Sequence, residues 1–509
     1  MSHFNGTANS NQTYEGGEAT PKSLEQEWTN MIFSSFLQDG FYETKEQYTA
    51  RMMQLNNAII NKYGANFATH ALDYVRNTLG MRTTASLLAA QLNGHQFEGK
   101  RNAFANYFRR PDDISETFAA IDEIGGKRSH ALIRGASDYL SNLSDYTLGK
   151  YKMKGHTYNM FDLINLTHAH SKTIDKYKSG ELKAPDTWEV RISTAKDADD
   201  RAKNWYDLVV GNKLGYLALL RNLRNIIGVM SYQDIKDYLV PQIVNKEAIK
   251  KSLVFPYQIY NAYKAIAVGE DTSWYDYEEW YEEQYSPSSF YEDSVEESKS
   301  KDLLVNALNN AFIYSIENVP ALDGKNCVIL DVSGSMSSPW SPTLSIIEVS
   351  AVYATAIILK NIENSQIIKF ASEAKVVDPV KDFENINTVF DIIYLLAKGD
   401  NIGYGTNLDK VTPFLDNYYD SIFLFSDMQV MESDGYMPYR EVSYFRDYCK
   451  HNPNTPIFSF DLGNYHQRVK TGLDNIYPIT TLSPNVFDFI SLVKEGKTLI
   501  DVINEAYSK

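Results

Sequence analysis

The hydrophobic pattern of this chain changes its period near Lys325, and that change limits the folds it can adopt. From about Ser23 to Val268, apolar residues recur every three or four positions, which is the spacing of one helix face. After Lys325, short apolar runs alternate with helical stretches, as in the strand-helix-strand units of a parallel sheet. The sequence therefore predicts an all-helical part followed by an α/β part.

The helical part is built from segments that each bury one face. In YTARMMQLNNAIINKYG, the residues Met52, Leu55 and Ile59 share a face, and Gly64 is a suitable stop. Strand-like alternation is nearly absent and no fixed repeat length occurs, so we expect stacked, HEAT-like helical hairpins. Three further segments follow the same rule: RTTASLLAAQLNG (82–94), KLGYLALLRNLRNIIGVM (213–230) and DLLVNALNNAFIYSIENV (302–319).

The α/β part has four apolar runs suited to buried strands: NCVILDVS, SQIIKFAS, SIFLFSDM and TPIFSFDLG. Helical stretches separate them, such as SIIEVSAVYATAIILKN (345–361) and YREVSYFRDYCKHN (439–452). This order predicts a doubly wound parallel sheet, whose ligands bind at the carboxyl ends of the strands.

Charge is distributed unevenly along the chain. Residues 1–269 carry 32 Lys and Arg against 28 Asp and Glu, whereas residues 270–509 carry 17 against 37. Because only basic groups near phosphates release counterions, the overall charge of −16 does not exclude nucleic acid binding by the helical part. Residues 270–298 hold eleven carboxylates, many Tyr and Trp, and no Lys or Arg. They predict an acidic insertion, either a solvated loop or a nucleic-acid mimic that covers a basic surface.

The remaining bulk features favour a cytoplasmic protein that does not enter membranes. The polar residues 1–22 predict a flexible tail without a signal peptide, and no apolar run is long enough to cross a bilayer. Two cysteines, Cys327 and Cys449, are too few for a disulfide framework and fit a reducing compartment as packing residues.

The first strand of the α/β part ends in an oxygen-rich sequence, DVSGSM. Asp331, Ser333 and Ser335 alternate there, and two later strand-end loops supply Thr406 and Asp427. Carboxylates and hydroxyls without His or Cys favour Mg²⁺, with Mn²⁺ or Ca²⁺ as alternatives, over zinc. The alternative without a ligand is that Asp331 caps the next helix and the serines bond to the backbone.

Enzymatic interpretations of this stretch fit less well. A haloacid-type phosphatase needs a second carboxylate where Ser333 stands. A serine hydrolase needs Gly-x-Ser-x-Gly with a histidine base, and His451 and His466 have no evident place in such an arrangement. No phosphate-binding Gly-x-x-x-x-Gly-Lys-Ser/Thr occurs in the chain.

The pattern Asp-x-Ser-x-Ser with a later Thr and a later Asp resembles the metal-ion-dependent adhesion site of von Willebrand factor A domains. The resemblance implies that Ser333 and Ser335 bind the ion directly. It implies that Asp331, Thr406 and Asp427 bind it directly or through water. Such domains usually bind partners rather than catalyse reactions, and the partner donates a carboxylate to the open position of the ion.

The helical part and its junction with the α/β part resemble the TROVE-domain family, which includes the Ro autoantigen and its bacterial relatives. The segments that carry the resemblance are MRTTASLLAAQL, YLSNLSDYTLGKYK, MFDLINLTHAH, TWEV, KLGYLALLRNLRNI and ENVPALDGKNCVILDVSGSM. It implies a monomeric ring of HEAT-like repeats at residues 23–320, closed by a von Willebrand factor A domain at 321–509. It further implies that small noncoding Y RNAs bind outside and single-stranded 3′ ends enter the hole.

A basic segment of the helical part has the chemistry that RNA binding requires. Residues 127–178 hold nine Lys and Arg against four acids, together with four histidines. Interleaved Tyr151, Tyr158 and Tyr177 could stack on unpaired bases. An ordinary solvated helix face is the alternative. The candidate RNA contacts are Lys127, Arg128, Arg134, Lys150, Lys152, Lys154, His156, His168, His170 and Lys172, with Lys176 and Lys178 in the same cluster.

Arg221 and Arg224 form a second candidate, because they are three residues apart on one expected helix face. They could line a hole, or pair with neighbouring acids. His168 and His170 fit a polar surface better than a metal site, since their spacing does not put both on one helix face.

These features together predict a non-catalytic RNA-binding ring. It would bind Y-like RNA and loose RNA ends as a scaffold in RNA quality control, with a divalent ion that recruits a protein such as an exoribonuclease. The alternative is a metal-dependent protein-interaction module without RNA. A metal-assisted hydrolase at Asp331 is the third possibility.

Overall fold

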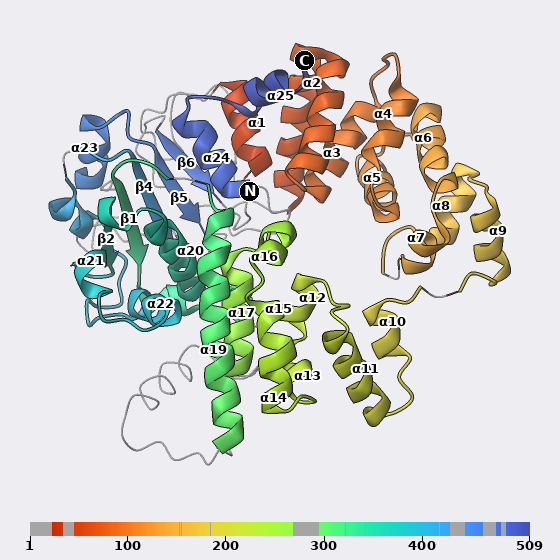
Figure 1. Ribbon diagram of the computed structural model, residues 1–509. Coiled ribbons are helices and arrows are strands. Elements are labelled where there is room, and N and C mark those ends of the chain that lie inside the picture. Colours follow the sequence, from red (N-terminus) through yellow and green to blue (C-terminus); the bar gives the residue numbers. More distant parts are fainter. Residues whose placement is uncertain are drawn as a thin grey trace. The chain divides into compact units, whose positions relative to one another are not determined.

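The computed structural model describes residues 23–33, 45–151, 153, 155–183, 185–267, 295–320, 322–341, 343–416, 418–427, 443–461, 475–479 and 485–508 (Figure 1). The expected tail, Lys152, Lys154 and most of the expected acidic insertion lie outside these ranges. No helix in the described ranges is long and apolar enough to cross a membrane.

The chain folds into two compact units. The N-terminal unit comprises residues 22–39, 43–193 and 492–509, and the sheet unit comprises residues 194–491 with two short N-terminal pieces. The sheet unit therefore joins helices of the expected helical part to the α/β part, while the expected domain limits of 23–320 and 321–509 stay a prediction.

The N-terminal unit is entirely helical over its described residues. Helix α2 contains a break at Gly64 (φ 85°, ψ 166°), which agrees with the stop expected there because this conformation favours glycine. The segment RTTASLLAAQLN forms α3, as expected. The elements are α1 (Leu24–Phe33), α2 (Lys45–Asp73), η1 (Tyr74–Thr78), α3 (Arg82–Asn93), α4 (Lys100–Tyr107), α5 (Pro111–Glu123), α6 (His130–Ser141), α7 (Asp145–Lys150), α8 (Met160–Thr167), α9 (Lys172–Ser179), α10 (Trp188–Ser193) and α25 (Leu499–Tyr507).

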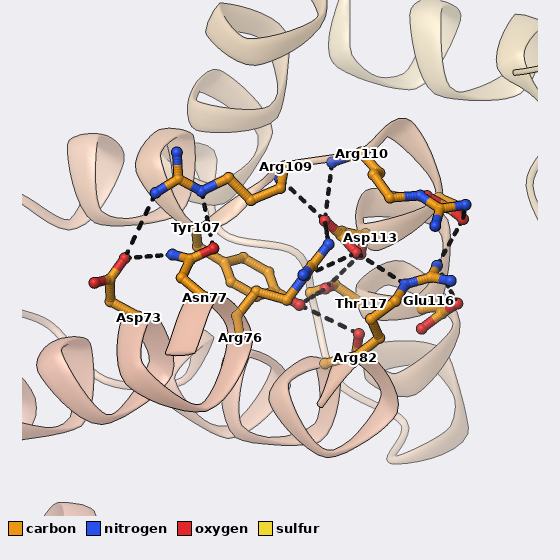
Figure 2. Close-up of polar contacts among 12 residues, drawn as sticks. Asp73, Arg76, Asn77, Arg82, Tyr107, Arg109, Arg110, Asp113, Glu116 and Thr117 are labelled. Atoms are coloured by element: carbon orange, nitrogen blue, oxygen red, sulfur yellow. Dashed lines mark hydrogen bonds and ion pairs between the residues drawn. The ribbon is translucent and has the colours of Figure 1, made fainter. Parts of the chain in front are cut away.

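A buried carboxylate at the start of α5 ties three of these helical elements together (Figure 2). Asp113 accepts hydrogen bonds from Arg76 Nε at 3.1 Å and Arg76 Nη2 at 2.9 Å. It also accepts bonds from the backbone N–H groups of Arg109 and Arg110, both at 3.0 Å. Arg82 lies 3.4 Å from the same carboxylate. Because Asp113 and Arg76 are both buried, each charge depends on the other for compensation.

The last helix of the chain packs in the N-terminal unit against α1 and α2. The backbone N–H of Leu499 donates to Thr29 Oγ1 at 3.0 Å, and Leu499, Ile500 and Ile503 are buried. At the other end of α25, the Tyr507 ring stacks on His70 with centroids 4.4 Å apart. Segments from opposite ends of the sequence therefore form one core.

The sheet unit contains a six-stranded sheet in the order β3-β2-β1-β4-β5-β6. The four expected strand segments are β1 (Asn326–Asp331), β2 (Ser365–Phe370), β4 (Ser421–Ser426) and β5 (Ile457–Asp461), all parallel. The sheet is mixed rather than wholly parallel, because β3 (Ala374–Val377) turns back antiparallel on β2 at one edge. The parallel strand β6 (Ile476–Ile479) at the other edge was also not expected.

Helices that lie between and after the strands in sequence cover the sheet. Helices from the segment before β1 pack against these covering helices. The helical elements are α11 (Ala198–Val210), α12 (Tyr216–Arg221), α13 (Leu223–Ile227), α14 (Tyr232–Asp234), η2 (Ile235–Leu239), α15 (Val240–Ile243), α16 (Lys246–Ser252), α17 (Pro256–Ala267), α19 (Val295–Ser315), η3 (Ile316–Asn318), η4 (Gly334–Ser337), α20 (Ile346–Lys360), η5 (Ile362–Asn364), α21 (Pro379–Asp382), α22 (Val389–Ala397), η6 (Leu408–Phe414), α23 (Ser443–His451) and α24 (Asn485–Lys494). Helix α19 begins at Val295, inside the last residues of the expected insertion.

A buried ion pair joins α17 to the sheet's covering helix α20. Lys264 Nζ lies 2.7 Å from Glu348 Oε1, and the Tyr260 hydroxyl donates to the same oxygen at 3.2 Å. Beside it, the rings of Tyr263 and Phe390 stack with centroids 3.8 Å apart. The segment before residue 268 is thus packed against the sheet layers by both charge and aromatic contacts.

One expected helix is wrong. The segment 213–230 forms two short helices, α12 and α13, because the chain leaves helical geometry at Asn222 (φ −109°, ψ 13°). The Asn222 amide nitrogen donates to the Ala218 carbonyl at 2.8 Å and so closes the end of α12. Arg221 and Arg224 therefore do not share one face of one helix, as the sequence had suggested.

Replacing Asp113 by Ala should destabilise the N-terminal unit by about 3–5 kcal/mol, because Arg76 would remain buried without its counter-charge. Hydrogen exchange of the amides in α3 and α5, read by mass spectrometry, would measure the change. Asp145→Ala is the matched control: it removes the exposed Asp145–Lys176 pair and should cost at most about 1 kcal/mol. Equal effects of the two substitutions would contradict this role of Asp113.

Candidate functional site

Two buried carboxylates lie at the carboxyl ends of neighbouring strands. Asp331 is the last residue of β1, and Asp427 directly follows β4, which pairs with β1 in parallel. Both side chains are fully buried. The chain order reverses between β1 and β4, so these residues stand where doubly wound sheets bind ligands.

The loop after β1 folds its two serines back toward Asp331. The Ser333 backbone N–H donates to Asp331 Oδ1 at 2.9 Å, and the Ser333 and Ser335 hydroxyl oxygens are 3.3 Å apart. From the neighbouring strand, the Ser426 hydroxyl donates to Asp331 Oδ2 at 2.6 Å. Both Asp331 oxygens are therefore oriented by the protein, and Ser426 is a site neighbour that the sequence did not suggest.

A third loop brings Thr406 to the same edge of the sheet. The Gly334 backbone N–H donates to the Tyr404 carbonyl at 3.1 Å, which joins this loop to the serine loop. The Asn407 N–H donates to the Ala371 carbonyl at 2.8 Å, next to the end of β2. Thr406, between these two anchors, is buried. The structure thus brings together the three loops that carry the five expected metal ligands.

Burial shapes the electrostatics of this edge. It raises the pKa of Asp331 to about 6, and the nearby charge of Asp427 acts in the same direction, against the hydrogen bonds from Ser426 and Ser333. Two buried carboxylates and three hydroxyls, of which only that of Ser335 belongs to a partly exposed residue, form a donor set suited to a hard divalent cation. Across the described residues, no three His, Cys, Asp or Glu side chains gather as they would around zinc.

A buried lysine in β2 binds the segment that leads into the Thr406 loop. Lys369 in β2 donates through its ammonium to the Leu395 carbonyl at 2.8 Å, to the Lys398 carbonyl, and to Asp400 Oδ2 at 2.9 Å. It therefore holds the end of α22 and the start of the loop, where Asp400 adopts a positive φ of 52°. Burial lowers the pKa of Lys369 to about 8, and Asp400 opposes that shift. The sequence SQIIKFAS predicted a buried strand but gave no sign of this lysine's role.

The candidate RNA residues of the N-terminal unit lie in the loop before α6, on α6, α7 and α9, and in the loops around α8. Lys127, Arg134, Lys150, His156, His168, His170 and Lys172 are all exposed there, whereas Lys152 and Lys154 fall outside the described residues.

Most of these basic groups have no acidic partner in the part of the chain that the structure describes. This holds for Lys127, Arg134, Lys150, Lys172 and Lys178. Three of the four nearby acids have other contacts: Asp138 pairs with Arg101 at 2.6 Å, and Asp145 pairs with Lys176 at 2.7 Å. Asp162 closes the capping box of α8. Asp175 on α9 is exposed without an ion pair in the described residues, so this surface is positively charged but one carboxylate offsets part of that charge.

Arg128 differs from the other candidates because it is engaged inside the molecule. Its guanidinium binds the Asp122 carboxylate and the Tyr158 hydroxyl at 2.5 Å, and lies 4.7 Å from the centre of the Phe118 ring. The Tyr151 ring lies 5.0 Å from the guanidinium of Arg110. Two of the three tyrosines expected to stack on bases are thus occupied by arginines of the same chain.

Arg221 and Arg224 are exposed on α12 and α13 and belong to the sheet unit. The charge of Arg221 lies near the Tyr257 hydroxyl, whose pKa is raised chiefly by burial and is lowered in part by this arginine. Their role in binding RNA stays a prediction.

Comparison with known proteins finds a family model and a solved structure that are similar to this chain. Residues 159–279 match the model of the TROVE domain. The fold of the chain is similar to the crystal structure of the Ro (RSR) protein of Deinococcus radiodurans. That match has a TM-score of 0.65 and 16% sequence identity, and it covers 94% of this chain and 100% of the other. At this identity, the likeness establishes the fold.

Lys369→Met should change how stability depends on pH. The pKa of Lys369 is about 8 in the folded chain, below the ordinary value of 10.5. Between these values the folded state releases the proton first, so the unfolded state binds more protons and stability rises with pH. The wild type should therefore gain up to roughly 3 kcal/mol relative to Lys369→Met between about pH 8 and 10.5.

Urea denaturation followed by circular dichroism at several pH values would measure that difference. Lys381→Met is the matched control, because Lys381 is 81% exposed in the same unit. A difference between wild type and Lys369→Met that stays flat across this range would contradict the interpretation.

Proposed function

We propose that this TROVE-domain protein is a non-catalytic RNA-binding protein of the Ro type. It binds small structured Y-like RNAs and the single-stranded ends of misfolded RNAs, and acts as a scaffold in RNA quality control. The observation that carries the proposal is the set of exposed basic groups on α6, α7 and α9 that have no acidic partner in the described chain. The TROVE match begins at residue 159, within this basic region.

The physical argument rests on counterion release. Each phosphate neutralised by a lysine or arginine frees condensed cations, which favours binding at low and moderate salt. Ion pairs within the protein would weaken this effect, and Lys127, Arg134 and Lys150 have none in the described residues. Exposed histidines at 156, 168 and 170 add hydrogen-bond donors for phosphate or base edges.

The sheet unit would add a divalent cation, and the chemistry of its donors favours Mg²⁺. Asp331, Ser333, Ser335, Thr406 and Asp427 would hold it, and the residues fit because two buried carboxylates balance its charge. When bound, the ion would offer one open position to an anionic oxygen. A carboxylate from a protein partner, such as an exoribonuclease, would occupy that position.

A second candidate function is a metal-dependent protein-interaction module that binds no RNA. The paired carboxylates at the ends of β1 and β4 favour it, because they do not depend on the basic surface of the N-terminal unit. The two functions separate by their response to salt, since carboxylate binding to one cation releases few counterions compared with an RNA backbone.

RNA affinity should fall steeply with salt and should depend on the basic surface. Lys150→Ala combined with Lys172→Ala should weaken binding of a structured RNA. It should also reduce the slope of log K against log salt by about two, because two phosphates would no longer be neutralised. Filter binding between about 50 and 200 mM salt would measure the slope. Lys381→Ala, which changes an exposed lysine of the sheet unit, should leave it unchanged.

Three results would contradict this proposal: no RNA binding at low salt, a flat salt response, or an equal decrease in the control. The first two would favour the module without RNA. The third would show that the measured affinity does not depend on this surface.

Mg²⁺ should stabilise the wild type and should not stabilise Asp427→Asn. A ligand at one hundred times its Kd adds about 2.7 kcal/mol to the free energy of unfolding. Thermal denaturation with and without Mg²⁺ would test this, and RNA binding should survive the substitution. Asp447→Asn, at an exposed acid paired with Lys450, is the control that should keep the Mg²⁺ effect. Equal stabilisation of all three proteins would exclude the proposed ligands.

A further inference from the structure

Helix α8 exposes apolar side chains on its solvent face. Its inner face is conventional, with Met160, Leu163 and Ile164 buried. On the outer face, however, Phe161 is 46% exposed and Leu166 is 39% exposed. Single exposed apolar residues are ordinary, and Leu166 lies five positions from Phe161, too far around the helix to form one patch with it. The neighbour that makes Phe161 notable is on the next helix.

Phe161 is paired with an aromatic ring of the next helix. The centroids of Phe161 and Tyr177, in α9, are 4.9 Å apart, and their planes are inclined by 37°. Phe161 stands in the first turn of α8, which the reciprocal capping box of Asn159 and Asp162 fixes. The side chain of Ser171 caps the first turn of α9 by accepting from the Ile174 N–H, and Tyr177 lies nearer the other end of that helix. The two rings contact each other from adjacent helices, so less conformational entropy is lost when a ligand packs on them than with two isolated side chains.

Basic groups accompany the aromatic pair. Helix α9 presents Lys172, Lys176 and Lys178 at its surface, and Lys178 directly follows Tyr177 in the chain. Lys176 is paired with Asp145 across to α7, but Lys172 and Lys178 have no acidic partner in the described residues. Asp175, between these lysines on α9, is an exposed carboxylate that offsets part of their charge. Aromatic rings with cationic groups beside them, here an exposed ring on α8 and lysines on α9, are the combination that binds single-stranded nucleic acid.

We propose that Phe161 and Tyr177 form a stacking platform for unpaired bases of RNA, with Lys172 and Lys178 on the adjoining phosphates. This inference rests on the proposed RNA-binding function and adds to it a base-binding subsite. Among the aromatic residues of the basic region, Tyr151 and Tyr158 pack against arginines of the same chain. Tyr146 (54%) and Phe161 (46%) are the strongly exposed ones, and Phe161 is chosen because a second ring, Tyr177, lies beside it.

Charge complementarity selects RNA as the occupant. A protein segment could cover Phe161 and Leu166, but it would leave Lys172 and Lys178 without partners unless it were acidic. A single RNA strand offers both a ring face and a phosphate in every nucleotide, at a spacing that repeats along the strand. The platform should therefore accept any base, prefer unpaired strands, and bind duplex RNA poorly because paired bases are already stacked.

The test compares Phe161→Leu with Phe161→Trp. Leucine keeps an apolar side chain but lacks the ring face, whereas tryptophan enlarges it. The probe is an oligoadenylate of about 12 nucleotides carrying 2-aminopurine, whose fluorescence is quenched when it stacks. Phe161→Leu should weaken binding roughly 5- to 150-fold and reduce the quenching, and Phe161→Trp should restore both.

Salt dependence separates base stacking from phosphate binding. Phe161→Leu should leave the slope of log K against log salt unchanged, while Lys172→Ala with Lys178→Ala should lower it by about two. Tyr418→Leu is the matched control, because Tyr418 is 57% exposed in the sheet unit and should not affect binding. Thermal denaturation of each variant would check that the fold is retained.

Wild-type affinity and quenching in Phe161→Leu would overturn the platform and leave the RNA-binding function intact. An equal decrease in duplex and single-stranded binding would overturn it too, since the effect would not depend on unpaired bases. If the wild type bound neither the oligoadenylate nor a structured RNA at low salt, the proposed function and this inference would fail together.

Discussion

Compensation of buried charge organises both units of this protein. Desolvating a charged group is costly unless an opposite charge or several hydrogen bonds replace the water. Asp113 meets this requirement through Arg76, Glu348 through Lys264, and Lys369 through Asp400 and two carbonyl groups. At the end of the central strands, by contrast, two carboxylates are buried near each other, and burial, with a smaller contribution from the charge of Asp427, raises the pKa of Asp331. The same physical rule that explains three contacts as structural makes this fourth group a candidate for a cation.

The sequence predicted the central strands well and the edges of the sheet poorly. Segments such as NCVILD and SIFLFS have an unbroken apolar centre because strands β1 and β4 are buried along their whole length, and that signal is local. Strand β3 is short, and only its last residue is buried, so AKVV has no comparable pattern. The break at Asn222 was missed for a similar reason. Helical spacing continues on both sides of it, and a single side chain bonded to the Ala218 carbonyl ends the helix.

At the candidate sites, the sequence indicated which residue types are present but not which residues contact one another. Residue types at strand ends were enough to predict that Asp331 and Asp427 lie side by side, because parallel strands present their carboxyl ends at one edge. Thr406 was also expected on a strand-end loop, but it lies between α22 and η6 and reaches this edge through backbone hydrogen bonds of its loop. The type of a residue does not show which other residue it will contact. The sequence alone does not distinguish Tyr158 from Tyr177. In the structure, the Tyr158 ring packs against Arg128, whereas the Tyr177 ring packs against Phe161. Likewise, the sequence does not distinguish Lys369 from any other lysine in a strand. In the structure, its ammonium donates to the Leu395 carbonyl in α22 and to Asp400 after it.

The docking of α25 on α1 and α2 bears on the order in which the chain acquires its structure. Residues 499–507 leave the ribosome after everything that precedes them, yet they supply Leu499, Ile500 and Ile503 to the core around the earliest helices. That core remains incomplete until residues 499–507 have been synthesised, so the apolar surface of α1 and α2 is covered later than the helices between them would allow. The bond from Leu499 to Thr29 joins residues 470 positions apart, and contacts of such long sequence separation form slowly.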